Sequence, residues 1–337
     1  MPRIYRLAYL LFLALITVSC SSGGSGFKLE GRFLNLNQGE FYVYSIDGAI
    51  GGLDTVMFDG GRFSRTFDCR RSGTLMIVFP NFSEQPVFAE PGKSVTVSAD
   101  ASHLKEMEVK GTKDNERMTR FRKESGDMSP PDVQALAEKY IREKPQSLVS
   151  IYLLRRYFLQ TASPDYAKAR ELVTIMADHP DENGNIMRLQ QEVTLSATSV
   201  TGGVMPQFTG TDIYGNAFDS RSLKGKISVI MCVGTWCFES MNQQRAMRIL
   251  QKKNPGKLNI VSLSIDADKK DIEKRTQRDS ITWPVLFDGE MFAGDAVRQT
   301  GLCRMPDNMI VDSDGRIIAR GLATSNLIEE VGNLLKE

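Results

Sequence analysis

The sequence predicts an α/β domain at the C-terminal end, preceded by a small all-β domain (a sandwich or a barrel) and a helical connector. Short runs of β-branched and aromatic residues, separated by turn residues, occupy the chain up to about residue 110. Apolar residues then recur at helical spacing, and beyond residue 202 buried-strand patterns alternate with helical ones. The length of 337 residues, about twice the ~150 of a typical domain, agrees with more than one domain.

Changes in composition and periodicity mark the expected boundaries. We divide the chain into a signal segment at 1–20, a flexible tether at 21–26, a β domain at 27–112, a helical connector at 113–200 and an α/β domain at 201–337.

Charge and composition restrict the function. Lys plus Arg number 42 against 41 for Asp plus Glu, so the formal net charge of +1 offers no basic excess for binding nucleic acid. Hydrophobic residues (41%) and charged residues (25%) occur in the proportions of an ordinary globular chain. Because there are only two histidines, we expect no multi-histidine metal site. We also expect no other metal and no cofactor. The five cysteines therefore carry the candidate chemistry.

The N-terminal segment has the pattern of an export signal. Arg3 and Arg6 precede an apolar run from Leu7 to Val18, which is shorter than the ~20 residues of a membrane-spanning helix. Small residues then lead to Cys20 and to the Ser/Gly-rich tether, and this pattern resembles a bacterial lipobox. The resemblance implies that Cys20 carries lipid and anchors the protein in a membrane. The alternative is an ordinary secretory signal in which Cys20 is incidental.

Either kind of signal places the rest of the chain in the cell envelope, where disulfides persist. The tether has no acidic cluster of the kind associated with surface export, so we expect the anchored protein to face the periplasm.

The segment from 27 to about 110 is predicted to form β structure. Phe41–Tyr44, Thr74–Phe79 and Ser94–Ser98 are short runs rich in β-branched and aromatic residues, with turn signals between them. Strands at this spacing are typical of a small sandwich or barrel. Cys69 stands alone in this segment, so we interpret it as a small buried hydrophobic residue.

From about 113 to 198 the sequence predicts a few antiparallel helices. Apolar residues recur with a helical period, and proline-containing pairs mark plausible helix starts. We interpret the apolar stripes as core. The alternative is that the stretch Tyr152–Leu159 presents a groove for a partner. His179 is expected in an exposed loop without a ligand partner.

The last segment combines buried strands with helices. Ile227–Val233 is a near-continuous apolar run, as expected of a strand that is buried on both faces. It breaks at Gly234–Cys237, after which a helical pattern begins. Leu258–Ile265 and Val285–Phe287 are predicted to be two further buried strands, and Asp312–Gly315 is a hairpin signal between the last two strands.

The C-terminal domain also carries short motifs in a specific order. They are Met205-Pro206-Gln207-Phe208, Tyr214-Gly215-Asn216, Leu223-Lys224-Gly225-Lys226, Trp236-Cys237, and a run from Arg304 to Gly315. Together they resemble a membrane-tethered thioredoxin of the TlpA/ResA type over residues 203–337. The resemblance implies a thioredoxin-like fold and thiol–disulfide chemistry. It also implies that the peptide bond before Pro306 is cis and lies beside the redox cysteine.

The β segment carries motifs of its own. They are Phe27-x-Leu29-x-Gly31, Asp59-Gly60-Gly61-Arg62-Phe63-Ser64, Phe88-x-Glu90-Pro91-Gly92 and Gly111-Thr112. They resemble the domain of unknown function that precedes thioredoxin modules in many lipoproteins of Bacteroidota. This resemblance implies architecture and little chemistry.

Cys237 is the candidate nucleophile. A cysteine at the point where a buried strand ends and a helix begins lies near unsatisfied helix amides and the positive end of the helix dipole. Both favour the thiolate, which is the reactive form. Trp236 is expected to shield one side of the sulfur, and Met305 with Pro306 to form a platform for an extended substrate.

Ser240 stands where a dithiol reductase of this type has its second cysteine. That cysteine attacks the mixed disulfide and releases the substrate, and serine cannot form the required bond. One helical turn from Cys237, the Ser240 hydroxyl is instead placed to donate a hydrogen bond to the thiolate. Cys303 is the best candidate for a resolving cysteine, since the intervening strand holds Cys232 too far from Cys237.

Three functions remain open at this point. In the first, Cys237 exchanges or captures mixed disulfides as a single thiol, with exported proteins or small thiols as partners. In the second, another cysteine resolves those disulfides. In the third, the domain has lost redox chemistry and binds clients or serves as a structural module. A peroxidase is disfavoured, because Gly234 stands where its motif has threonine. The sequence assigns no oligomeric state.

Overall fold

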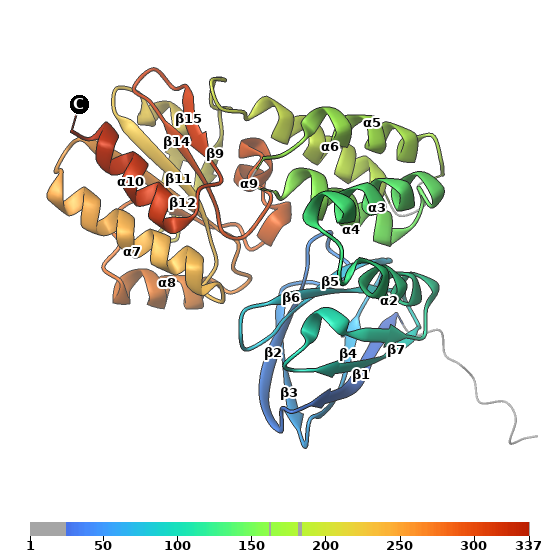
Figure 1. Cartoon of the computed structure of the whole chain (residues 1–337). Helices are drawn as coiled ribbons and strands as arrows, with labels where there is room; N and C mark the ends of the chain where they lie inside the picture. The colour runs from blue at the N-terminus through green and yellow to red at the C-terminus, as the bar shows by residue number, and fades with distance from the viewer. Residues whose placement is uncertain (1–24, 162, 181–183, 337) are drawn as a thin grey trace, which may run out of the picture.

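The computed structural model describes residues 25–161, 163–180 and 184–336, which form three contiguous domains (Figure 1). The expected signal segment and Cys20 lie outside the described residues. Within the described part of the chain, no helix is both long enough and apolar enough to cross a membrane.

The N-terminal domain is an all-β domain built on one nearly closed eight-stranded sheet, as predicted. Its strands are β1 Gly26–Leu34, β2 Gln38–Ser45, β3 Leu53–Asp59, β4 Arg62–Asp68, β5 Gly73–Val78, β6 Glu84–Ala89, β7 Ser94–Asp100 and β8 Glu108–Lys110. They pair in the order β6-β5-β2-β3-β4-β1-β7-β8, and only β1 and β7 run parallel.

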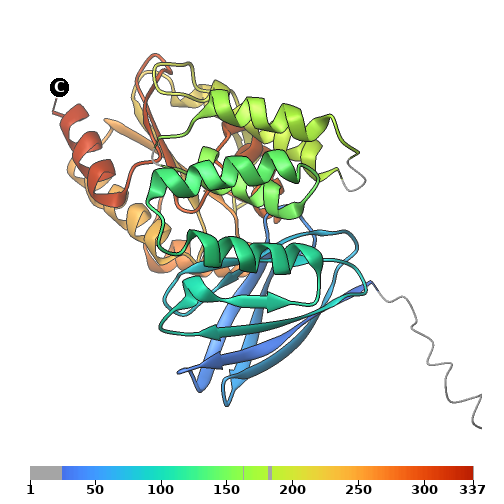
Figure 2. The same ribbon diagram turned by 45° about the vertical axis from the view of Figure 1, so that its right-hand side comes forward.

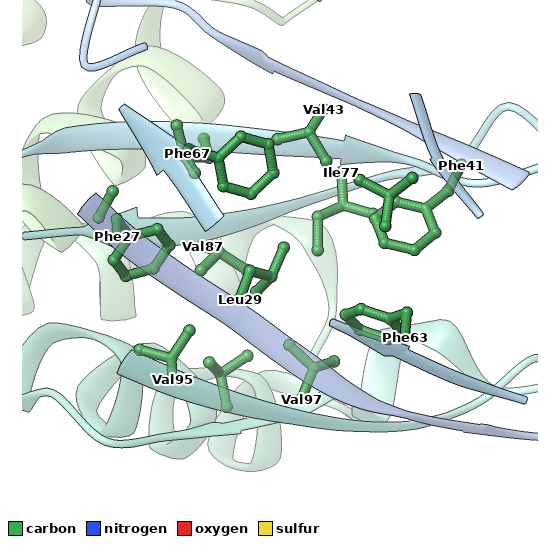
Figure 3. Packing of buried hydrophobic residues seen from close by; sticks show 14 of the residues in the cluster. Phe27, Leu29, Phe41, Val43, Phe63, Phe67, Ile77, Val87, Val95 and Val97 are labelled. Carbon is green, nitrogen blue, oxygen red and sulfur yellow. The ribbon is translucent and has the colours of Figure 1, made fainter. Parts of the chain in front are cut away.

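The interior of this sheet is filled by aromatic and β-branched side chains that alternate with exposed ones along the strands (Figure 3). Phe27 and Leu29 of β1 are fully buried there, beside Val95 and Val97 of β7. Cys69 is also buried in this core, in agreement with its interpretation as a small hydrophobic residue.

Helix α2 (Lys113–Ser125) joins the two edge strands of the sheet. Asn115 accepts a hydrogen bond from the backbone N–H of Phe88 on β6 and donates one to its carbonyl. Thr119 makes the same two kinds of bond with Val109 on β8. Arg122 donates to the carbonyls of Pro86 and Met107. The helix therefore satisfies backbone groups that an open sheet edge would leave unpaired.

Strands β2 and β5 are buried on both faces. Phe41 and Val43 of β2 point into the β-domain core, whereas Tyr44 belongs to a second core that is shared with the C-terminal domain. On β5, Leu75 and Ile77 point inward while Met76 and Val78 join the shared core. This arrangement explains why these two segments are continuous apolar runs rather than alternating ones.

The middle domain is a helical bundle. After α2 it comprises α3 Pro130–Glu143, α4 Leu148–Leu154, a π-helical turn Arg155–Leu159, α5 Tyr166–Ala177 and α6 Asn185–Thr198. Their apolar faces form one buried cluster, which Phe88 of β6 enters from the β domain. His179, just after α5, is exposed.

The C-terminal domain is a five-stranded sheet covered by helices on both faces. The strands β11 Ile227–Val233, β12 Leu258–Ser264, β13 Val285–Leu286, β14 Asp307–Val311 and β15 Ile317–Arg320 pair in the order β13-β12-β11-β14-β15. Strands β11, β12 and β13 are parallel, and β14 and β15 are antiparallel to their neighbours. A short hairpin of β9 Thr209–Thr211 and β10 Ala217–Asp219 precedes this sheet.

The two faces of this sheet have different partners. Helices α7 Phe238–Lys253, α8 Lys269–Arg278 and α10 Thr324–Leu334 contribute to the core on one face. The other face packs on α9 Asp295–Thr300 and on the β domain, with Tyr44, Met76 and Val78 in contact with its core. The three domains consequently converge at this face (Figure 2).

Candidate functional site

Cys237 lies in the short connection between β11 and α7, as the N-cap residue of that helix. Its backbone N–H donates to the carbonyl of Gly234 (2.9 Å), so the loop turns sharply between strand and helix. Ser240 is fully buried, and its single O–H proton is shared between the carbonyls of Cys237 (2.9 Å) and Gly234 (3.2 Å). The same hydroxyl accepts the N–H of Gly234 (3.2 Å), so Ser240 also supports the shape of the loop.

The electrostatics of Cys237 differ from the expectation. Burial raises the pKa of the thiol above its ordinary value. The N–H groups of Ser240 and Glu239 and the hydroxyl of Ser240 act in the opposite direction, as a helix N-terminus should. The helix start therefore favours the thiolate as expected, but loss of hydration outweighs it in this arrangement of the domains.

The β domain contributes to this burial, because Tyr44, Met76 and Val78 belong to the core against which Cys237 packs. The ring of Tyr44 packs on Trp236 in a tilted arrangement with ring centroids 4.9 Å apart, and it stacks on Phe292 at 5.9 Å. Phe82, at the tip between β5 and β6, stacks on Phe238 immediately after the cysteine (5.9 Å). Trp236 is only 7% exposed. Aromatic side chains of the β domain thus contact both sequence neighbours of Cys237, Trp236 and Phe238.

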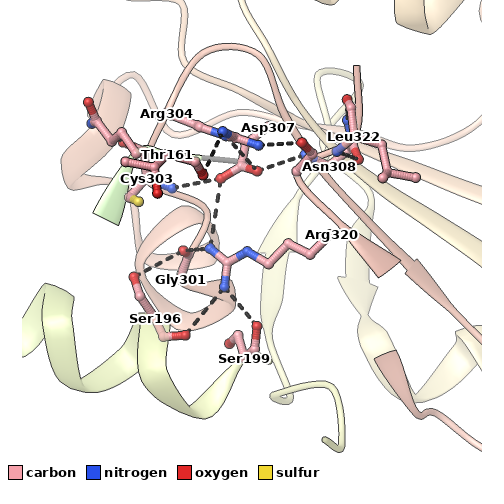
Figure 4. Close-up of polar contacts among 12 residues, drawn as sticks. Thr161, Ser196, Ser199, Gly301, Cys303, Arg304, Asp307, Asn308, Arg320 and Leu322 are labelled. Atoms are coloured by element: carbon pink, nitrogen blue, oxygen red, sulfur yellow. Dashed lines mark hydrogen bonds and ion pairs between the residues drawn. The ribbon is translucent and has the colours of Figure 1, made fainter. Parts of the chain in front are cut away.

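Met305 and Pro306 form the neighbouring loop, and the peptide bond between them is cis, as the resemblance implied. The next residue, Asp307, is 2% exposed and forms ion pairs with Arg304 (3.5 Å) and Arg320 (3.8 Å) (Figure 4). Asp307 also accepts the backbone N–H of Cys303 (3.2 Å). Buried charge held by two arginines and a backbone amide fixes the course of the chain through this loop.

A cleft of about 390 Å³ opens beside the Met305–Pro306 loop, at the junction of the three domains. Its walls include Tyr44 and Glu84 from the β domain and Tyr152 and Arg155 from the helical domain. The hydroxyl of Tyr44 donates to Glu84 across this wall (3.2 Å). The stretch Tyr152–Leu159 thus contributes both to the helical core, through Phe158 and Leu159, and to the surface of the cleft.

Cys303 also lines the cleft but has the properties of a poor nucleophile. Burial, together with the nearby carboxylates of Glu192 and Asp307, raises the pKa of its thiol to about 12. The four cysteines of the described residues are all free thiols. Cys232, inside strand β11, is fully buried, and burial also raises the pKa of its thiol.

Comparison with known proteins agrees with this architecture. Residues 201–320 match the AhpC/TSA family, and residues 27–118 match a domain of unknown function, DUF4369. The C-terminal domain is thioredoxin-like. Its sequence is similar to thiol–disulfide oxidoreductases named ResA. The relative from Bacillus thuringiensis is 27% identical over 133 residues, covering 38% of this chain and 75% of the relative. The relative from Geobacillus thermodenitrificans is 23% identical over 135 residues, covering 38% and 74%.

Solved structures of the same kind resemble this thioredoxin-like domain. A thiol–disulfide oxidoreductase from Bacteroides fragilis is 18% identical, with a TM-score of 0.36, and the match covers 39% of this chain and 98% of that one. A secreted disulfide oxidoreductase from Mycobacterium tuberculosis is 22% identical, with a TM-score of 0.32, covering 38% and 96%.

The structure gathers the residues that the sequence singled out at one end of the thioredoxin-like sheet. Trp236, Cys237 and Ser240 lie at the start of α7, while Cys303 and the cis-proline loop border the cleft. No group of three or more metal-ligating His, Cys, Asp or Glu side chains occurs among the described residues.

Sequence reasoning missed the contributions of the other two domains. Tyr44, Phe82 and Glu84 come from the β domain, and Arg155 comes from the π-helical turn. The one available signal was the unbroken apolar run at Phe41–Tyr44, which indicates a strand covered on both faces.

Proposed function

We propose that the protein acts in thiol–disulfide exchange or mixed-disulfide capture through the single nucleophile Cys237. The observation that supports this most directly is the position of Cys237 at the start of α7, next to Trp236. Helix amides that favour a thiolate point at this position, which suits a sulfur nucleophile. The similarity of the domain to thiol–disulfide oxidoreductases supports the same chemistry.

The exchange follows from the residues present. The Cys237 thiol loses its proton to solvent, and the thiolate attacks one sulfur of a client disulfide. A Cys237–client disulfide forms as the client's own S–S bond breaks, and the other client sulfur leaves as a thiolate. Because residue 240 is serine, release of the client requires a second thiol from outside this loop, which attacks the mixed disulfide and restores the Cys237 thiolate.

Burial of Cys237 controls how much of its thiol is in the reactive thiolate form. While Tyr44 and Phe82 pack on Trp236 and Phe238, the raised pKa keeps most of the thiol protonated at neutral pH. A movement of the β domain that separates these contacts would hydrate the thiol and increase the thiolate fraction. The reaction therefore depends on exposure of Cys237.

A trapping experiment tests this function. The protein is incubated at pH 8 with a peptide disulfide, quenched with acid and analysed by intact mass spectrometry. We expect one peptide adduct on Cys237, its removal by added dithiothreitol, and no adduct on the Cys237→Ser variant. An adduct that forms equally on Cys237→Ser, or no adduct even at pH 9, would refute the redox role.

The second candidate is a redox-inactive module that binds clients. The raised pKa of Cys237 and the serine at position 240 favour it. It predicts that Cys237→Ser binds exported clients as tightly as the wild type does. A pull-down from the envelope fraction under acid quench separates the two functions, because only the redox function yields clients that are released by reductant.

We propose further that the protein is anchored in the cell envelope through a lipid on Cys20 and faces the periplasm. The lipobox-like pattern supports the anchor, and the similar mycobacterial disulfide oxidoreductase is a secreted protein, in agreement with export. Cys20→Ala should move the protein from the membrane fraction to the soluble fraction. Retention of Cys20→Ala in the membrane fraction would contradict the anchor.

A further inference from the structure

A second, smaller cavity adjoins the cleft at the junction of the three domains. It has a volume of about 120 Å³. Five residues line both spaces: Ile46, Arg155, Gln160, Phe292 and Cys303. They come from the β domain, the helical domain and the thioredoxin-like domain, so this junction exists only in the assembled chain.

Arg155 is the charged group at the boundary between the two cavities. It is the first residue of the π-helical turn, a local distortion that is frequent at functional sites. The residue is 5% exposed, and its Nε donates to Glu192 on α6 (2.8 Å). Its Nη1 is buried and has no hydrogen-bond partner among the described residues. A guanidinium that is removed from water with an unused donor is under-satisfied by the protein alone.

The nearby carboxylates do not complete this pairing. Asp47 lies in the same cavity, but its oxygens accept the N–H of Thr74 (2.8 and 3.1 Å) and the hydroxyl of Ser45 (2.9 Å). Glu192 is paired with Nε of Arg155. The cavity walls carry four arginines and two acids, so their formal charge is positive. They are Arg71, Arg155, Arg188 and Arg298, with Asp47 and Glu192.

The apolar residues of the lining indicate that the part of the ligand beyond its charged group is apolar. Leu195, Val297 and Leu302 give the smaller cavity an apolar wall. A space of 390 Å³ in the adjoining cleft is within the range of small-molecule sites. A singly charged group suits this position better than a doubly charged phosphate, because two protein carboxylates already lie close by.

We propose that this junction binds a small carboxylate-bearing ligand with an apolar body, whose carboxylate pairs with Arg155. The carboxylate comes from a free small molecule or from the C-terminal end of a peptide, and both present the same group to the guanidinium. This inference depends on the cavity and not on exchange at Cys237, so each stands without the other. A bound ligand would contact all three domains beside the cleft that Tyr44 lines.

Isothermal titration calorimetry with the full exported chain tests the proposal. The probes are N-acetylleucine, its amide, the tetrapeptide Ala-Ala-Ala-Leu with a free C-terminus, and inorganic phosphate. We expect N-acetylleucine, the tetrapeptide or both to bind at least tenfold more tightly than the amide. Binding of the tetrapeptide identifies a chain end as the source, and binding of N-acetylleucine alone identifies a small molecule. Equal binding of acid and amide, or preference for phosphate, would overturn the proposal.

Two variants give opposite expected results. Glu192→Gln removes the competing carboxylate, so the acid probe should bind at least threefold more tightly. The double variant Arg155→Gln with Glu192→Gln removes both charges together, which leaves no unpaired buried ion, and should lose the preference for acid over amide. Thermal melting confirms that each variant is folded. An acid preference that persists in the folded double variant would refute the role of Arg155.

Discussion

Tyr44, in the second strand of the β domain, packs its ring against Trp236, the residue immediately before the candidate nucleophile Cys237 (ring centroids 4.9 Å apart). The contact links the β domain to the thioredoxin-like domain through a core that both domains share. It gives the β domain a direct influence on the candidate thiol, since burial is the leading cause of the raised Cys237 pKa.

Removal of the Tyr44 ring should activate Cys237. In Tyr44→Ala, water reaches the thiol, its pKa falls, and the rate of alkylation by iodoacetamide at pH 7 rises roughly threefold to tenfold, because one pKa unit changes the thiolate fraction tenfold. The pH–rate curve should move to lower pH. Tyr214→Ala, which removes an exposed tyrosine of the thioredoxin-like domain, is the control and should match the wild type. An unmoved pH–rate midpoint in Tyr44→Ala would show that this ring does not govern the thiol.

Restoring a cysteine at position 240 should create a dithiol. Residues 237 and 240 are one helical turn apart, and the Ser240 hydroxyl already contacts the Cys237 carbonyl. Oxidised Ser240→Cys should therefore lose two hydrogens by mass and gain catalytic insulin reduction with dithiothreitol.

Ser240→Ala is the matched control for this exchange. It should form no disulfide and should lower the free energy of unfolding by about 1–2 kcal/mol, because the N–H of Gly234 loses its buried acceptor. If Ser240→Cys remained a dithiol under oxidation, the two side chains would not face one another as the structure indicates.

Cys303 should not resolve a mixed disulfide on Cys237. A thiol with a pKa of about 12 is almost entirely protonated at neutral pH and attacks slowly. In Cys303→Ser, the amount and lifetime of a Cys237–peptide adduct at pH 8 should equal those of the wild type, as measured by mass spectrometry. Cys69→Ala, in the distant β core, is the control. A longer-lived adduct in Cys303→Ser alone would establish Cys303 as the resolving thiol.

The sequence was informative wherever function depends on local pattern. The apolar run Ile227–Val233, followed by Trp236 and Cys237, predicted a strand-to-helix junction with a cysteine at the helix start, and the structure has this junction. The strand run at Phe41–Tyr44 likewise lies in β2, and the run at Thr74–Phe79 lies in β5 except for its last residue. These features follow from periodicity and helix capping, which a single segment encodes.

The remainder depends on contacts between distant segments. The raised pKa of Cys237 could not be predicted from the sequence, because helix amides are a local property, whereas burial in the core that contains Tyr44 is produced by domain packing. Arg155 had no periodic signal of its own, since a π-helical turn interrupts the helical pattern there. A sequence shows which faces are apolar but not which domain covers them.

The last prediction concerns Asp266, which holds the loop before Trp236. It is 3% exposed and accepts the N–H (2.8 Å) and the hydroxyl (2.6 Å) of Thr235. Burial raises its pKa despite these bonds. Folding therefore favours the protonated acid. The resulting stabilisation is complete below the unfolded pKa of ~3.9 and is lost as the pH rises through the higher folded value.

Asp266→Asn mimics the protonated acid, so it should raise Tm at pH 7 by roughly 1–3 °C and leave Tm at pH 4 nearly unchanged. Thermal denaturation followed by circular dichroism measures both. Asp268→Asn is the control, because Asp268 is an exposed N-cap whose oxygen accepts from the N–H of Lys270, and asparagine caps a helix equally well. Its Tm should not change at either pH. A lower Tm of Asp266→Asn at pH 7 would mean that the ionised carboxylate, through its bonds to Thr235, stabilises the loop more than burial destabilises it.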